Sequence, residues 1–148
     1  MDQQRRTALR LWIILNRTVE SIEKALEEQV SNHGLSLTEF AILEVLHHKG
    51  PQPIGEIGDK VLLTSGSMTY VIDKLQKRGL LTRRKCTEDR RVLYAELTEK
   101  GAEKMERVFP EHAELITELM AAIPVEEQNR VADALKQIGL AAPERVDA

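Results

Sequence analysis

The residues best suited to chemistry in this chain form a run of positive charge between residues 74 and 91. That run holds eight lysines and arginines against two acidic residues, a local charge of +6, although the whole chain carries −3. The remaining residues therefore carry −9. A cationic island on an acidic protein favours a polyanionic partner. Its basic members are Lys74, Lys77, Arg78, Arg83, Arg84, Lys85, Arg90 and Arg91.

Short hydroxyl side chains stand just before this run, at the start of a segment with helical periodicity. Met68, Val71, Ile72 and Leu75 are spaced as one apolar face, which predicts a helix over 65–78. The opposite face then carries polar residues, several of them small enough for a close approach to a charged surface. The candidates for direct contact on and before this helix are Thr64, Ser65, Ser67, Thr69, Tyr70 and Lys74.

Apolar periodicity also predicts the elements that position these residues, and the fold class is mainly α with a small β-hairpin. Strands are expected over 80–85 and 92–97. Two short helices joined by a tight connection at 62–64 and followed by a hairpin form a winged helix-turn-helix. Helices are expected over 5–31, 38–48, 54–61, 65–78, 98–122 and 124–139.

The long helices outside this module carry more apolar surface than the module can cover. We therefore expect them to pack on one another and on a second copy of the chain, as dimerisation helices. The predicted organisation is a winged helix-turn-helix DNA-binding domain at 37–98 and a helical dimerisation region at 1–36 and 99–148.

A winged helix-turn-helix places the start of its second helix in the major groove, where backbone donors and short side chains meet phosphates and base edges. At the hairpin tip, Arg90 or Arg91 can enter the minor groove, and Asp89 can hold one of them by an ion pair. Arg84 extends the same basic surface. Each residue alone is also compatible with a solvated face or a helix cap, but their combination in one module favours DNA binding.

The segment 50–101 resembles the core of the MarR family of bacterial transcriptional regulators. The wing of that family carries an Asp-x-Arg pattern, present here from Asp89 to Arg91, and its next strand ends in Leu-Thr-x-x-Gly, present here from Leu97 to Gly101. Length and helix order also agree, so the resemblance covers most of the chain apart from 1–8 and 140–148. It implies a homodimer on a pseudo-palindromic operator in double-stranded DNA, with Arg91 in the minor groove.

The resemblance also implies a regulator, in many members a repressor, that small phenolic, aromatic or electrophilic ligands release from DNA. The segment 60–75, together with the tip at 87–91, looks closest to quinone-responsive members. A ligand pocket between the dimerisation helices and the reading module would be lined by Trp12, Asn16, Phe40 and His47. The alternative is that Trp12 and Phe40 belong to the core.

Other functions have less support in the sequence. The single cysteine, Cys86, is either an ordinary strand residue or a redox sensor activated by neighbouring cations. No catalytic motif and no metal-ligand spacing is found, so we expect neither an enzyme nor a metal or cofactor. The absence of a membrane-length apolar run and of a leader favours the cytoplasm. Because winged helices also bind proteins, a protein-interaction module remains an alternative.

Overall fold

The structure of the chain is a computed structural model that describes residues 2–61 and 65–142, with the side chains of residues 65–67 left out. The predicted tight connection at 62–64, which includes Thr64, lies outside the described residues. The chain divides into two compact units, Met1–His112 and Ala113–Ala148, which are described one at a time.

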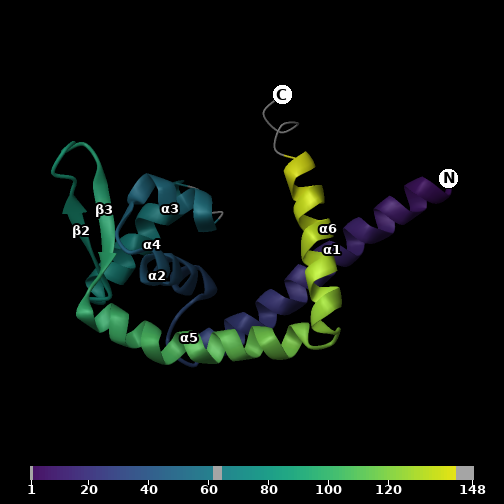
Figure 1. Cartoon of the computed structure of the whole chain (residues 1–148). Helices are drawn as coiled ribbons and strands as arrows, with labels where there is room; N and C mark the ends of the chain where they lie inside the picture. Colours follow the sequence, from purple (N-terminus) through teal and green to yellow (C-terminus); the bar gives the residue numbers. More distant parts are fainter. Residues whose placement is uncertain (1, 62–64, 143–148) are drawn as a thin grey trace. The chain divides into compact units, whose positions relative to one another are not determined.

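Helices and strands follow the predicted order (Figure 1). One helix, α5, runs from the first unit into the second, and each predicted helix is present with ends that agree to within two residues. The elements are α1 (Gln3–Ser31), α2 (Leu37–Lys49), β1 (Gln52–Pro53), α3 (Ile54–Val61), α4 (Ser65–Lys77), β2 (Leu81–Lys85), β3 (Leu93–Leu97), α5 (Glu99–Met120) and α6 (Val125–Ala141).

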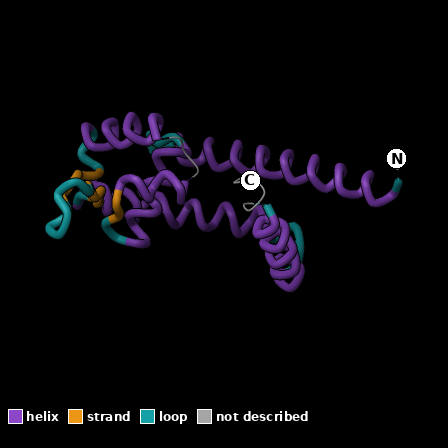
Figure 2. Tube along the Cα trace, turned by 90° about the horizontal axis from the view of Figure 1, so that it is seen from above, coloured by secondary structure: helices purple, strands orange, loops and turns teal. Residues whose placement is uncertain are grey.

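A small antiparallel sheet with strand order β1-β3-β2 completes the winged helix, and its strands lie together at one end of the first unit (Figure 2). Strand β1 was not predicted. It is two residues long, too short for an alternating pattern, and pairs Gln52 with Ala95 and Pro53 with Tyr94 of β3. Proline is tolerated there because β1 is an edge strand that needs no donor on its outer side.

Local signals explain where α2 begins. The backbone N–H of Glu39 donates to Ser36 Oγ at 3.0 Å, and the N–H of Ser36 donates to Glu39 Oε1 at 2.8 Å. This reciprocal pair is the predicted capping box, which satisfies two donors that a helix start leaves free. Just before it, Gly34 adopts φ +74°, a left-handed conformation that ends α1.

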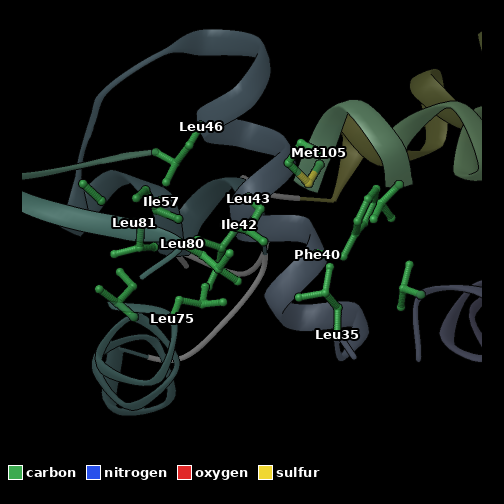
Figure 3. Close-up of a cluster of buried hydrophobic side chains, with 14 of the residues drawn as sticks. Leu35, Phe40, Ile42, Leu43, Leu46, Ile57, Leu75, Leu80, Leu81 and Met105 are labelled. Carbon is green, nitrogen blue, oxygen red and sulfur yellow. The ribbon is translucent and has the colours of Figure 1, made fainter. Parts of the chain in front are cut away.

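The core lies between α2, α3, α4, the sheet and the first half of α5 (Figure 3). Helix α1 contributes only Leu26 and Val30, near its C-terminal end, and most of its other residues are exposed. Aliphatic side chains dominate this core, as the low aromatic content requires. Its largest fully buried members are Phe40, Ile42, Leu43, Ile57, Ile72, Leu75, Leu80, Leu81, Met105, Val30 and Val108.

The base of the β2–β3 hairpin is fixed to the start of α5. The Thr98 hydroxyl donates to the carbonyl of Gly79 at 2.5 Å and accepts from the N–H of Gly101 at 3.0 Å. Gly101 is buried, and a Cβ there would lie 2.0 Å from the carbonyl oxygen of Leu80. The Leu-Thr-x-x-Gly pattern therefore has a physical basis, since the threonine bridges hairpin and helix and only glycine allows their close approach.

The second unit contains the end of α5 and the whole of α6. The side-chain amide of Gln128 donates to the carbonyls of Met120 and Ile123, each at 3.0 Å, and so closes the turn between the helices. Pro124 was predicted as the first residue of the last helix, but it occupies the position just before α6. No residue of α6 within the described part is buried. Among the described helices, none is both long and apolar enough to cross a bilayer.

Candidate nucleic-acid interface

Helix α4 separates its apolar and polar side chains as the sequence predicted. Met68, Ile72 and Leu75 are at most 3% exposed and anchor the helix in the core. Thr69 lies on the outer face, and Tyr70 there is 69% exposed. The side chains of Ser65 and Ser67 are not among those described. The described part of the predicted reading face therefore points to solvent.

At the hairpin tip, Asp89 holds the side chain of Arg91. Arg91 Nε donates to Oδ1 of Asp89 at 3.0 Å and one terminal nitrogen donates to Oδ2 at 3.1 Å. These bonds lower the pKa of Asp89 and raise the pKa of Arg91. The Arg91 side chain is nevertheless 90% exposed. The tip thus presents an oriented guanidinium to solvent, with the neighbouring Arg90 also exposed.

The helix and the tip face one shared hollow, of about 720 Å³, which also receives the start of α3. Thr69 of α4 and Arg91 of the tip both line it, although 22 positions separate them in the sequence. Its other walls come from Arg83 of β2 and Tyr94 of β3. The structure therefore brings together two of the predicted contact residues with others, among them Arg83 and Tyr94, that were not predicted DNA contacts.

Arg83 was missed as a functional candidate, and it joins the hairpin to α4. Its two terminal nitrogens donate to Asp73 Oδ1 at 2.6 Å and to Gln76 Oε1 at 2.5 Å. Arg83 pairs with the fully buried Ala95 and alternates with the buried Leu81, so it lies on the sheet face that meets α4. Because side chains alternate between the two faces of a strand, the sequence of β2 could have predicted that Arg83 lies on a different face from Arg84.

Two other predicted contact residues lie in different settings. Arg84, one position after Arg83, lies on the other face of the sheet, with its guanidinium carbon 5.8 Å from the centre of the Tyr94 ring. Lys74 Nζ lies 4.0 Å from Oε2 of Glu39, a buried carboxylate that also accepts from Arg78 at 3.2 Å. Part of the positive charge therefore ties α4 to α2 and to the hairpin.

The four predicted ligand-pocket residues do not gather in one place. Trp12 and Asn16 line a hollow formed by α1 alone, where the Asn16 amide donates to the Trp12 carbonyl at 2.8 Å. Phe40 is 1% exposed, and its ring centre lies 4.4 Å from that of His112. His47 lies in the same group of rings, 6.3 Å from Phe109.

This ring cluster between α2 and α5 contains two buried imidazole nitrogens without a hydrogen-bond partner among the described residues, Nδ1 of His47 and Nδ1 of His112. Burial lowers the pKa of His112, against the opposing effect of the Glu44 carboxylate, whose oxygen lies 3.9 Å away. An imidazole nitrogen that has no protein partner is available to form a hydrogen bond with a hydroxyl group.

A helix with a polar outer face and a wing with an oriented arginine, both lining one hollow, define a DNA-binding protein of the winged helix-turn-helix class. Residues 35–93 match the sequence profile of the MarR family. The chain is also 46% identical over 133 residues to the HTH-type transcriptional regulator MhqR of Bacillus subtilis, covering 90% of this chain and 92% of that protein. The chain belongs to the MarR family of transcriptional regulators, as its wing motifs predicted.

Solved structures agree on the fold. AbsC, a MarR family transcriptional regulator from Streptomyces coelicolor, matches with a TM-score of 0.82 at 24% identity over 95% of both chains. Reduced AbfR bound to DNA matches with a TM-score of 0.72 at 25% identity, over 92% of this chain and 94% of that one. NadR in complex with 4-hydroxyphenylacetate matches with a TM-score of 0.75 at 20% identity, over 85% and 89%. The matching proteins are regulators rather than enzymes.

Proposed function

We propose that the chain acts in the cytoplasm as a homodimeric repressor that binds a pseudo-palindromic operator and is released by a small phenolic, aromatic or quinone-like ligand. In this proposal α4 reads the major groove, with Thr64, Ser65, Ser67, Thr69 and Tyr70 nearest the bases. Arg91 enters the minor groove, and Lys74, Arg84 and Arg90 contribute positive charge. The observation that carries the proposal is the shared hollow, lined by both Thr69 and the Asp89-held Arg91.

The DNA-binding step is tested with an operator selected from random duplex DNA, measured by fluorescence anisotropy. Arg91→Ala should weaken binding by about tenfold and reduce the salt dependence by about one phosphate contact. Arg130→Ala, which removes the same charge from an exposed position of α6, is the matched control and should bind as the wild type. Equal affinities of the wild type and both variants for the operator would show that Arg91 of the wing does not contact DNA.

Thr69→Ala tests direct reading of bases in the major groove. A lost base contact should change the preferred sequence at one position of each half-site, because base contacts carry the sequence information. The measurement is a repeat of the selection from random DNA with the variant. An equal loss of affinity for all sequences would make Thr69 a phosphate contact instead.

The proposal of a dimer is supported by large apolar side chains that are exposed to solvent in the single chain. Exposed large apolar residues concentrate on α1 and α6, and a contiguous exposed apolar surface marks an interaction site. In this proposal residues 1–36 and 99–148 form the dimer and 37–98 the reading domain. The exposed residues are Leu9, Leu11, Trp12, Ile13, Ile14 and Val19 on α1, and Val125, Val131, Leu135, Ile138 and Leu140 on α6.

Analytical ultracentrifugation tests this assembly. Leu135→Glu should place a charge in the interface and yield monomers, whereas Lys136→Glu, at the next exposed position, should leave the dimer intact. A wild-type monomer, or a Leu135→Glu dimer of unchanged affinity, would contradict the proposed interface. A wild-type monomer that binds all DNA equally would favour the alternative of a protein-interaction module.

The ligand part of the proposal is supported by the ring cluster between α2 and α5. Phe40 and His47 were predicted pocket residues, and the free imidazole nitrogens there suit a phenolic hydroxyl. A further support is NadR, a structural relative seen with 4-hydroxyphenylacetate. Phenols and quinones should release the operator from the wild type, and His47→Ala should need more ligand than the control His33→Ala, which changes a histidine that pairs with Glu111 outside this ring cluster. Release at the same concentration in both variants would remove His47 from the ligand site.

A further inference from the structure

A second hollow lies away from the wing tip, where the end of α4 meets the start of α5. It has a volume of about 400 Å³ and lies entirely within the first unit. Three of its residues, Lys100, Lys104 and Arg107, follow one another at steps of four and three and so share one face of α5. The full lining is Lys77, Arg78, Leu80, Lys100, Lys104 and Arg107.

The positive charge of this hollow is largely uncompensated. Arg78 is paired with the buried Glu39 at 3.2 Å, and Lys100 Nζ donates to the Arg78 carbonyl at 3.0 Å. Lys77, Lys104 and Arg107 take part in no ion pair within the described part of the chain. Five cationic side chains therefore share one concave surface, and Arg78 alone among them is in an ion pair in the described part of the chain.

Lys104 reports this imbalance most directly. Partial burial lowers its pKa first, and the charges of Arg78, Arg107 and Lys100 lower it further. A lysine on a fully solvated helix face experiences neither this burial nor this repulsion from neighbouring positive charges. An anion bound among these side chains would offset the electrostatic repulsion between them.

The hollow is separate from the proposed DNA-reading surface. It is lined by Leu80, which directly precedes β2, whereas Arg91 lies in the tip between β2 and β3. A five-residue strand spans roughly 15 Å. None of the residues that line the hollow shared by Thr69 and Arg91 lines this one.

We propose that this hollow is a binding site for a small multivalent anion that carries a phosphoryl group. A phosphoryl group offers three oxygens and up to two charges, which suits several cations arranged around one point better than a single carboxylate does. The volume is large enough for a small phosphorylated molecule. Arg107 supplies a planar fork, and the lysines supply point charges around it.

The site is tested on the full chain with pyrophosphate as the probe, by isothermal titration calorimetry at fixed ionic strength. The wild type should bind one pyrophosphate per chain, and Lys104→Gln and Arg107→Gln should each bind about tenfold more weakly. Lys49→Gln, which removes an exposed charge outside the hollow, should bind as the wild type. Absence of saturable binding, or equal affinity in all four proteins, would overturn the proposal.

Two further measurements separate this site from DNA binding and from misfolding. Without pyrophosphate, Lys104→Gln and Arg107→Gln should bind operator and random DNA as the wild type does. A fall in affinity for both DNAs would make the hollow part of the DNA surface and overturn the small-anion site, whatever the fate of Arg91. Thermal unfolding should show both variants folded, with pyrophosphate raising the midpoint of the wild type more than theirs.

Discussion

Gly101→Ala should destabilise the protein although it places a better helix former inside α5. The added methyl would lie 2.0 Å from the carbonyl oxygen of Leu80, 3.0 Å from its carbonyl carbon and 3.3 Å from a methyl of Leu97. Two of these atoms belong to the backbone and cannot rotate away. The start of α5 must therefore move from the hairpin, and the hydrogen bonds of Thr98 to Gly79 and Gly101 must stretch.

The size of the effect follows from opposing contributions. Forcing an extra carbon into a packed contact costs ~1–3 kcal/mol, and each weakened hydrogen bond costs up to about 1 kcal/mol. Replacing glycine inside a helix returns at most about 1 kcal/mol. The net loss is about 2 kcal/mol, which for a chain of this size lowers the unfolding midpoint by about 6 °C.

The assay is thermal unfolding followed by circular dichroism at one fixed protein concentration, since dimerisation makes the midpoint depend on concentration. Gly55→Ala is the matched control, because Gly55 is also in a helix but has no atom within 4 Å of the added Cβ. That variant should be as stable as the wild type or slightly more stable. A Gly101→Ala protein that unfolds with the wild type would refute the close approach of hairpin and helix.

Three other perturbations have defined outcomes. Arg83→Ala should weaken operator binding by about tenfold while Arg84→Ala, on the other sheet face, has a smaller effect; anisotropy that shows equal losses would contradict a bracing role. Ser36→Ala should lower the free energy of unfolding in urea by about 1 kcal/mol, and an unchanged midpoint would mean that the capping box contributes nothing. Because burial lowers the pKa of His112, the unfolded chain binds a proton first once the pH falls below about 6.5, so stability declines with acidification. His112→Leu should show a shallower decline, and parallel pH curves would exclude His112 as the cause.

Much of the fold was predictable because its signals are local. The capping box of Ser36 and Glu39 and the apolar face of Met68, Ile72 and Leu75 depend on neighbours within one helical turn or two. Asp89 was expected to hold Arg90 or Arg91 for the same reason, and it pairs with Arg91, two residues away. Strand β1 was missed because two residues carry no period.

The roles of individual cations were less predictable, since the sequence shows charge but not its partner. Arg83 and Arg84 look equivalent in the run, yet the register of β2 places one against α4 and the other beside Tyr94. The four residues predicted to line one ligand pocket lie in two different places for a similar reason. Trp12 and Phe40 both lie on apolar helix faces, but periodicity does not state which faces meet across the fold.

Arg83 also links the two elements that we propose to contact DNA, the hairpin and α4. Its hydrogen bonds to Asp73 and Gln76 brace the hairpin against α4. In the proposed DNA complex, a hairpin and helix braced in this way would fit only duplexes whose major and minor grooves have matching widths where the two elements enter. Stiff or bent sequences would then be accepted or refused by their shape, even at base pairs that no side chain touches.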